Sequence, residues 1–583
     1  MNEYNLDILY KGYEDPKFKE DFETLTILCD KAKDFALKLG TPNNKETVIE
    51  ILKLNEELVD LISDLSNYLA LKMSVNTSDI DAINYNNYIT QLLSSITKAN
   101  TQMDKYIIGC TNLESFIQED EFLKQYEYYL NNLKKSGKYL LDDQVEEAIS
   151  KMNINGGLAW EKQWEFLTSS IEIEMDGKMY GLAALRNFAY DTDPIIRKKA
   201  YEAELEGYDK IKDAIAFSLN SIKGQVNTLC EMRGYESPLA QALEATDMKK
   251  ETLDAMFASM REYMPKFRTY MKRKAKLLGH ENGLPFYDMF AAIAENDKKY
   301  SLKEAEDYLV TNFNKFSSEL ADMVQRAFKE EWIDFYPRKG KVGGAFCLNM
   351  PKYKQSRVLT NYDGYFTDIV TLAHELGHAF HGQQIDTHAP LNRNYSMPVA
   401  ETASTFNENL IMNTAIRENE GAEKLSLMES QLQDTTQIIL DIYSRFLFES
   451  EVFERRKDEF LFADQLEDIM LRAQKEAYGD GLDPNYLHPY MWICKSHYYS
   501  TGLSFYNFPY AFGGLFARGL YALYLEQGDV FVKKYNEMLH ATTITSVEDC
   551  AMVMGVDLTK KEFWEKSLAS YCEIIDAFLE ATN

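Results

Sequence analysis

The pentapeptide that begins at His374 constrains the fold most, because its two histidines come close enough to share one ligand only in a helix. It reads His374-Glu-Leu-Gly-His378, and the surrounding segment 367–381 has apolar residues at helical spacing. On a period of 3.6 residues, the histidines fall one turn apart, opposite an apolar stripe. That stripe consists of Ile369, Leu372, Ala373, Leu376 and Phe380. The segment therefore predicts a helix with one face in the core and the other free to bind a ligand.

Two imidazoles one helical turn apart are typical of a hydrolytic zinc site. They can bind one Zn²⁺ in neighbouring tetrahedral positions, and Glu375, about 100° round the helix, can reach an attacking water. A catalytic zinc has three protein ligands and keeps a fourth position open. We therefore predict one zinc ion per chain, with His374 and His378 as ligands and Glu375 as general base.

The segment 396–409 follows this motif after a loop and is expected to supply the third ligand. Ser396 before Pro398 predicts a helix start, which puts Glu401 in the first turn, facing the metal. Glu408 falls on the same face of this helix. Because metal-bound histidines commonly need an acceptor for their other N–H group, Glu408 is expected to support a ligand rather than bind the metal.

Two further residues of the motif helix need an explanation. His381 shares the face of His374 and is an alternative third ligand, but two histidines with a carboxylate form a common hydrolytic zinc set. We therefore favour a supporting or surface role for His381. Gly377 lies in mid-helix, where glycine costs about 1 kcal/mol relative to alanine. A close approach by the helix that carries Glu401 would explain it.

The composition limits the class of protein. A chain of 583 residues, 45% of them hydrophobic, can bury a large core and form two or more domains. Its 92 acidic and 63 basic residues give a formal charge of −29, which opposes binding to nucleic acid or an anionic membrane. Seven scattered cysteines suggest a reducing compartment. The first residues show no secretory signal, and segment 508–525 is interrupted by Arg518, so we predict a cytoplasmic protein.

Hydrophobic periodicity predicts a mainly α fold. Segment 17–150 is a succession of helical patterns, whereas segment 171–180 alternates with period two around Asp176-Gly177, which predicts a β-hairpin. Asp193 before Pro194 predicts the start of another helix. The individual helices are expected at 46–72, 79–99, 193–233, 249–278 and from 302 onward. Small shifts in composition place a domain boundary near residue 195, dividing the chain into 1–195 and 196–583.

The motif and the segment after it carry a family resemblance. His374-Glu-Leu-Gly-His378 followed by Ala400-Glu-Thr-Ala-Ser-Thr-Phe-Asn-Glu408 resembles oligoendopeptidase F, within the thimet-oligopeptidase-like zinc peptidases. The similarity covers roughly residues 195 to 575 and is weaker before them. It extends to Tyr336-Pro-Arg-Lys-Gly-Lys-Val-Gly-Gly-Ala-Phe346, Tyr478-Gly-Asp480, His497-Tyr-Tyr and Phe505-Tyr-Asn-Phe-Pro-Tyr-Ala-Phe-Gly513.

The resemblance implies an ellipsoidal, two-lobed helical metallopeptidase with small antiparallel β elements. It also implies a deep central channel between the lobes, with zinc at its floor, that admits only short unstructured peptides. Residues 1–195 would form part of the channel wall, and residues 196–583 the catalytic domain. By position in the motif, His374, His378 and Glu401 correspond to the family's zinc ligands and Glu375 to its general base.

A late aromatic segment adds candidate catalytic residues. By the same resemblance, His497 and Tyr506 match the histidine and the first tyrosine of the family's substrate-binding motif. Tyr510 departs from the pattern, since thimet-type relatives have the second tyrosine three residues after the first and here the gap is four. Phenol and imidazole donors aimed at a developing oxyanion are worth about 3 kcal/mol each. Without the resemblance, an aromatic stretch of this kind would be read as core.

A glycine-rich segment before the motif is a candidate substrate-binding element. Gly343, Gly344, Ala345 and Phe346 belong to a stretch that matches the family. We expect an edge strand that pairs with the substrate main chain and gives affinity with loose sequence preference. A simple glycine turn is the alternative.

These observations predict a zinc-dependent endopeptidase that hydrolyses short oligopeptides. One alternative is a zinc carboxydipeptidase, which would need a cation for the terminal carboxylate of the substrate. The other is a non-catalytic peptide-binding protein with a structural metal. A structural zinc is more often closed by four ligands rich in cysteine, and no cysteine lies near this motif. Oligomeric state, cleavage preference and physiological substrate are left open by the sequence.

Overall fold

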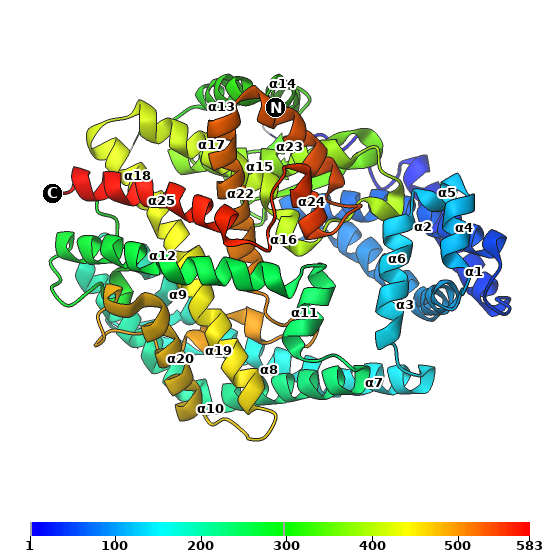
Figure 1. Cartoon of the computed structure of the whole chain (residues 1–583), viewed down its shortest axis with the longest axis horizontal. Coiled ribbons are helices and arrows are strands. Elements are labelled where there is room, and N and C mark those ends of the chain that lie inside the picture. Colours follow the sequence, from blue (N-terminus) through cyan, green and yellow to red (C-terminus); the bar gives the residue numbers. More distant parts are fainter. Residues whose placement is uncertain (1–2, 295–297) are drawn as a thin grey trace.

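The computed structural model describes residues 3–294 and 298–583, which form a mainly helical protein with two small β-sheets. Figure 1 shows the N-terminal helices at one end of the long axis and the C-terminal helices across the rest of the molecule. The predicted mainly α class is confirmed. Among the described helices, none combines the length and the apolar character that crossing a membrane requires.

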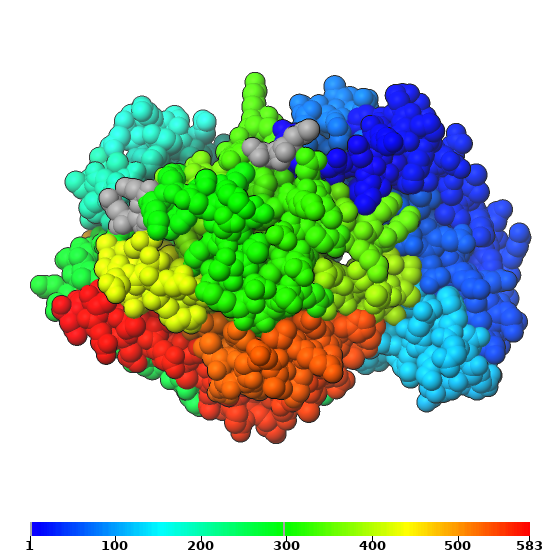
Figure 2. Space-filling model, turned by 90° about the horizontal axis from the view of Figure 1, so that it is seen from above, coloured from blue at the N-terminus to red at the C-terminus, as the bar shows by residue number. Residues whose placement is uncertain are grey.

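The N-terminal region begins with helices that pack on one another. Asn44 and Asp79 cap α2 and α3 by accepting hydrogen bonds from backbone N–H groups, so both helices begin close to where the sequence predicts. Val342 N donates to Ser74 O at 2.9 Å, which links this region to the segment before the motif helix. Figure 2 shows the blue N-terminal residues against the green part of the chain. The helices of the region are α1 (Pro16–Leu37), α2 (Lys45–Val75), α3 (Ile80–Ile108), α4 (Leu113–Glu119), α5 (Glu121–Lys124), α6 (Glu127–Ser136), η1 (Gly137–Tyr139), α7 (Asp143–Asn155) and α8 (Gly157–Ser170).

The first sheet is the predicted hairpin. Strands β1 (Glu172–Met175) and β2 (Lys178–Gly181) pair antiparallel, and Asp176 and Gly177 connect them with φ of 52° and 77°. Both central residues of a type I′ turn need positive φ, which aspartate tolerates and glycine adopts freely. The hairpin packs on α10.

Long helices follow the hairpin. Asp193 caps α10 by accepting from Ile195 N, and Pro194 occupies the first helical position, as the sequence predicts. The helices predicted at 249–278 and from 302 are also present. The elements of this part are α9 (Leu182–Asn187), η2 (Phe188–Tyr190), α10 (Pro194–Arg233), α11 (Pro238–Thr246), α12 (Lys250–Leu277), η3 (Phe286–Asp288), α13 (Leu302–Phe316) and α14 (Ser318–Lys329).

The second sheet precedes the motif helix and is mixed. It contains β3 (Ile333–Asp334), β4 (Phe346–Met350) and β5 (Gln355–Leu359) in the order β3-β5-β4. β4 is antiparallel to β5, but β3 is parallel to β5. The predicted small antiparallel elements are present as β1–β2 and β4–β5, and the parallel pairing of β3 with β5 adds to them. The long loop after β3 lets the chain reverse before β4, so that β5 returns along β3 in the same direction.

The remaining helices surround the motif helix, α15. α15 packs along α17, and α17 packs against α22, which in turn contacts α25. In Figure 1, α15, α17 and α22 lie together. The elements are η4 (Pro351–Tyr353), α15 (Phe366–Ile385), η5 (Pro390–Asn392), α16 (Met397–Ala400), α17 (Thr402–Glu418), α18 (Gly421–Thr436), the π-helical turn η6 (Gln437–Asp441), α19 (Ile442–Arg455), α20 (Ala463–Tyr478), η7 (Gly479–Gly481), α21 (Met491–Cys494), η8 (Ser496–Tyr498), α22 (Phe508–Gln527), α23 (Asp529–Ala541), α24 (Val547–Val553) and α25 (Lys561–Ala581).

The buried side chains form separate hydrophobic clusters. The largest surrounds α12, α15, α17, α22 and α25, and a second joins α1, α2 and α3 with Met350 and Leu359 of the mixed sheet. A third joins Ile173 of the hairpin to Phe448 and Trp492. Two of these clusters contain residues from both sides of residue 195. The division into 1–195 and 196–583 stays a prediction.

Candidate active site

The helix α15 holds the motif as its sequence predicts. Every member of the apolar stripe is buried: Ile369, Leu372, Ala373, Leu376 and Phe380. His374 and His378 lie on the other face and are only partly exposed. Burial of the stripe therefore fixes the rotation of the helix and with it the direction of both imidazoles.

Two side chains of α15 and one from the junction between α16 and α17 converge at this face. The Nε2 atoms of His374 and His378 lie 3.2 Å apart, and Glu401 Oε2 lies 3.3 Å from each of them. Within the described residues, this is the one group of three or more His, Cys, Asp or Glu side chains whose ligand atoms converge closely enough to hold a metal ion. The sequence prediction brought together the same three residues.

These spacings fit a tetrahedral metal site. Ligand atoms that bind one Zn²⁺ tetrahedrally at 2.0–2.1 Å are themselves about 3.3 Å apart. The three measured separations agree with that value. Two imidazoles and one carboxylate occupy three corners, so a metal ion held here would have a fourth position open to a water or a substrate oxygen.

Glu401 lies at a junction between two helices. α16 begins after Ser396, as predicted, but it ends at Ala400, and Glu401 separates it from α17. Glu401 therefore follows the first turn of the expected helix rather than lying inside it. Ser404 Oγ donates to Glu401 Oε2 at 2.7 Å, and Gly513 of α22 packs against its Cβ. These contacts hold the carboxylate towards the histidines.

Glu408 and a second acid lie behind His374. Glu408 Oε1 lies 2.6 Å from His374 Nδ1 and accepts a hydrogen bond from its N–H group. The other ring nitrogen, Nε2, faces Glu401. Burial opposes the imidazolium form, yet the hydrogen bonds with Glu401 and Glu408 raise the pKa of His374 to about 10.

Asp434 of α18, which no pattern in the sequence indicated, lines a cavity together with His374 and Glu408. Burial, with the charges of Glu408 and Glu429, raises the pKa of Asp434 to about 7.

Glu375 is buried beside the histidines and faces a cavity. Its side chain is 6% exposed and lines a cavity of about 410 Å³ together with His374 and Ala345. Burial raises the pKa of the Glu375 carboxyl, an effect that the nearby histidines oppose. A carboxylate with a raised pKa that faces a cavity has the properties of a general base.

Gly377 allows α15 and α17 to touch. A Cβ atom at Gly377 would lie 2.5 Å from Ser404 Cα and 2.6 Å from Ala403 O, which are backbone atoms of α17. Asn407 Nδ2 of α17 also donates to Ala373 O at 3.2 Å. The predicted close approach of the two helices at Gly377 is confirmed.

His381 does not join the metal-binding group. Its side chain is completely buried, its Nε2 lies 2.8 Å from Thr542 Oγ1, and its ring stacks on Tyr395 with centroids 4.4 Å apart. Burial, with the charge of His378, lowers the pKa of His381 to about 3. The surface role that we allowed for His381 was therefore wrong, because segments distant in sequence cover this end of the helix.

The glycine segment precedes an edge strand. β4 lies at the edge of its sheet and packs on α15, but it begins at Phe346, so Gly343, Gly344 and Ala345 form the bend before it. Gly344 has φ of 77°, a left-handed conformation that ends the extended backbone. Asn349 Nδ2 of β4 donates to His378 O at 3.3 Å. The expected strand is thus present, shifted towards the C-terminus.

The three late aromatic candidates form one cluster. The ring centroids of His497, Tyr506 and Tyr510 lie 5.3 to 5.7 Å apart. His497 belongs to η8, Tyr506 to the loop after it, and Tyr510 to the first turn of α22. Burial, with the charges of Arg445 and Lys495, lowers the pKa of His497 to about 4. His497 is therefore neutral at neutral pH and keeps one N–H donor.

A buried ion pair holds the loop that carries Tyr506. Lys223 of α10 and Glu449 of α19 are both fully buried and lie 2.7 Å apart. Glu449 also accepts hydrogen bonds from Phe505 N and Asn507 Nδ2, each at 3.1 Å. Phe505 has φ of 55°, which is strained for an aromatic residue. The sequence gives no local signal for this support, because Lys223 and Glu449 are far apart in the chain.

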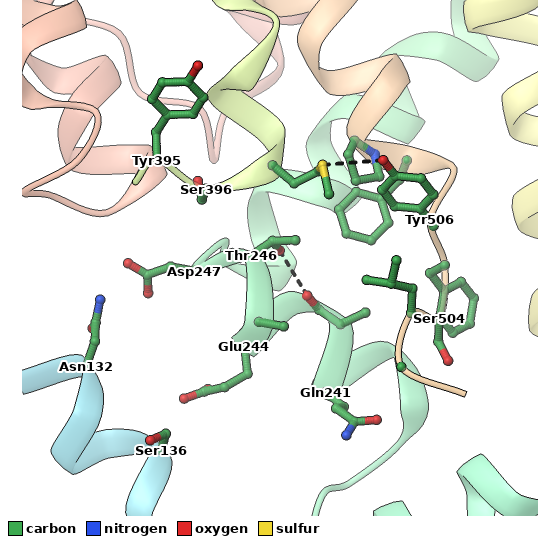
Figure 3. A pocket seen from close by; sticks show the side chains of 18 of the residues that line it. Asn132, Ser136, Gln241, Glu244, Thr246, Asp247, Tyr395, Ser396, Ser504 and Tyr506 are labelled. Atoms are coloured by element: carbon green, nitrogen blue, oxygen red, sulfur yellow. Dashed lines mark hydrogen bonds between the residues drawn. The ribbon is translucent and has the colours of Figure 1, made fainter. Parts of the chain in front are cut away.

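A cavity of about 530 Å³ lies beside Tyr506. Figure 3 shows it bounded by α6 with Asn132, by α11 with Glu244 and Asp247, and by the segments that carry Tyr395 and Tyr506. Tyr506 Oη donates to the sulfur of Met397 at 3.6 Å across one side. The N-terminal region therefore contributes a wall to a space that reaches the aromatic cluster.

Sequence comparison places these features in a known family. Residues 187–570 match peptidase family M3, and residues 108–172 match the region described as oligopeptidase F. The chain is 23% identical to oligopeptidase PepF of Bacillus subtilis over 97% of its own length and 85% of that protein. It is 22% identical to group B oligopeptidase PepB of Streptococcus agalactiae over 98% of its own length and 96% of that protein.

Solved structures share the fold. A putative peptidase from Chlamydophila abortus superposes with a TM-score of 0.83 at 20% identity, covering 100% of this chain and 98% of that one. Oligoendopeptidase F from Enterococcus faecium superposes with a TM-score of 0.72 at 17% identity, covering 97% and 98%. The resemblance inferred from the motif is confirmed. The chain belongs to peptidase family M3 and is a metalloendopeptidase.

Proposed function

We propose that this protein hydrolyses short oligopeptides with one zinc ion held by His374, His378 and Glu401. The observation that carries the proposal is the set of ligand separations of 3.2 and 3.3 Å, which match the edges of a tetrahedral zinc site. Zinc is the fitting metal because it takes nitrogen and carboxylate ligands in this geometry. Zinc bound there would supply a Lewis acid that polarises the scissile carbonyl and makes water nucleophilic near neutral pH.

Glu375 acts as the general base. Its buried carboxylate accepts the proton of the attacking water and then delivers it to the leaving amine. Burial raises its pKa, so the carboxylate takes a proton more readily than an exposed glutamate would. Glu408 holds His374 in one orientation through its hydrogen bond to Nδ1.

The aromatic cluster stabilises the negative charge that develops on the carbonyl oxygen. Tyr506 and Tyr510 offer phenolic O–H donors, and neutral His497 offers one N–H donor. Gly513, one helical turn after Tyr510, packs against Glu401, so the cluster borders the ligand group. This closeness supports a catalytic role for Tyr510 despite the four-residue gap after Tyr506.

The substrate main chain binds beside β4. Ala345 lines the same cavity as His374 and Glu375, and β4 is an edge strand that packs on α15. A peptide extended along β4 from Phe346, with Gly343, Gly344 and Ala345 at the bend before it, would form main-chain hydrogen bonds, which bind backbone without selecting side chains. Such binding requires an unfolded segment, which favours short flexible peptides over folded proteins.

Replacing Glu375 by glutamine tests the mechanism directly. The amide keeps the size of the side chain but accepts no proton, so we expect Glu375→Gln to retain one zinc and lose about 10²- to 10⁴-fold in turnover. Zinc is measured by atomic emission and cleavage by mass spectrometry of a mixed peptide library, with and without a chelator. The exposed Glu580→Gln variant serves as control and should cleave normally. Near-normal turnover of Glu375→Gln would rule out the proposed base.

A further inference from the structure

A third cavity, of about 380 Å³, lies between α9, α10 and the segment that leads to His497. Its polar lining differs from that of the cavity in Figure 3, where Glu244 and Asp247 contribute negative charge. The charged and polar residues that define it are Arg186, Tyr190, Arg197, Glu204, Gln437 and Lys495.

One basic side chain in this cavity has no direct partner among the described residues. Arg197 pairs with Asp288 at 2.7 Å, and Arg186 lies 3.4 Å from Glu204. The side chain of Lys495, by contrast, makes no hydrogen bond or ion pair within residues 3–294 and 298–583, although the charge of Asp441, which pairs with Arg445, also acts on it. A partly buried ammonium group without a partner is unfavourable. Burial lowers the pKa of Lys495, and an anionic ligand in the cavity would stabilise its charged form.

The turn η6 borders both this cavity and the candidate active site. Gln437 lines it, whereas Ile438, the next residue of the turn η6, lines the cavity that contains Glu375. Lys495 also precedes His497 by two residues, and its charge contributes to the lowered pKa of that imidazole. A peptide bound at the metal site that extends past η6 and His497 would bring one end near Lys495.

We propose that Lys495 binds a carboxylate of the peptide substrate, supplied either by its free C-terminus or by an acidic side chain near that end. This inference rests on the proposed function. A carboxylate would form a charge-assisted hydrogen bond with the ammonium group. In the other cavity, Lys135 already pairs with Glu244 and Asp247 at 3.4 and 3.5 Å, so the carboxylate is assigned to Lys495.

Matched peptides test the proposal. One peptide carries a free C-terminal carboxylate, a second is the same sequence amidated, and a third is amidated with glutamate as its last residue. For the unaltered protein, we expect kcat/KM about tenfold higher for the first peptide than for the second. In Lys495→Met the ratio should fall to near one. The third peptide shows whether an acidic side chain replaces the terminal carboxylate.

The outcomes separate this inference from the proposed function. Equal kcat/KM for all three peptides in the unaltered protein would overturn the role of Lys495 while leaving the peptidase activity established. An unchanged ratio in Lys495→Met would overturn it as well. Lys534→Met, which removes an exposed lysine of α23, is the control and should keep the ratio of the unaltered protein. If none of the peptides is cleaved with zinc present, both proposals fail.

Discussion

The metal-binding group and the aromatic cluster border one another but are held in place by different means. The candidate metal-binding group lies on α15 and at Glu401, the junction between α16 and α17, and the backbones of α15 and α17 touch at Gly377. The aromatic cluster lies on η8, an irregular loop and the start of α22, and a strained residue, Phe505, precedes Tyr506. A buried ion pair between Lys223 and Glu449 supports that loop.

This difference has a consequence for mutations. Residues on regular helices inherit their positions from helix geometry and from the packing of an apolar face. Residues on the loop depend instead on hydrogen bonds with segments far away in the chain. Changes at the metal-binding group should therefore alter metal content, whereas changes at the aromatic cluster should alter turnover and leave metal content intact.

The largest expected effect is loss of a ligand. Glu401→Ala removes one of three donors, so we expect zinc to be lost and turnover to fall by about 10³-fold or more, as loss of several kcal/mol of transition-state stabilisation implies. Zinc content and peptide cleavage measure the two effects together. Glu420→Ala, an exposed glutamate on a neighbouring segment, should leave both unchanged. Full zinc content in Glu401→Ala would contradict the ligand assignment.

The second largest effect on turnover is expected in the aromatic cluster, where kcat should fall while zinc stays bound. Tyr510→Phe removes a single hydroxyl that we assign to oxyanion stabilisation, so kcat should fall by about 10²- to 10³-fold while one zinc remains bound. Tyr506→Phe should lower kcat less, because the Tyr506 hydroxyl also donates to the Met397 sulfur. Tyr88→Phe, far along the chain on α3, provides a matched control. If both Tyr510→Phe and Tyr506→Phe turn over normally, the cluster has only a packing role.

A weaker effect is expected where the support of the loop is changed. Glu449→Gln leaves Lys223 without its anionic partner, and breaking a buried pair costs about 3–5 kcal/mol of stability. We expect a lower melting temperature and a roughly tenfold drop in kcat/KM, with zinc content unchanged. Glu454→Gln, an exposed position on the same helix, should have little effect. Loss of zinc from Glu449→Gln would show that the two regions are not independent.

The same contrast explains what could be predicted from the sequence. The motif helix, the hairpin at Asp176-Gly177 and the start of α10 at Pro194 follow from local patterns of residues, and all three are present. The position of Glu401 in the chain, shortly after a predicted helix start at Ser396, also predicted that it faces the histidines. The break between α16 and α17 at Glu401 was not predicted. Local signals thus accounted for most elements and for the ligand set.

Long-range contacts account for what the sequence did not reveal. His381 is buried by Tyr395 and by Thr542, which follows it by more than 150 residues. The parallel pairing of β3 with β5 and the support of Phe505 by Glu449 likewise join distant segments. No periodicity, cap or motif encodes such contacts, because they arise only when the whole core packs.

The smallest expected effect on turnover tests whether helix contact alone sets the ligand geometry. Gly377→Ala places a methyl group 2.5 Å from Ser404 Cα, so α17 must move away from α15. We expect about 1–3 kcal/mol of destabilisation, as for overpacked cores, with weaker zinc binding and severalfold lower turnover. Gly40→Ala is the control, since a Cβ atom at Gly40 has no neighbour within 4 Å. If the Gly377→Ala protein is destabilised but binds zinc with normal affinity, the distance between α15 and α17 does not set the ligand geometry. The break between α16 and α17 would then let the Glu401 side chain keep its position beside the histidines.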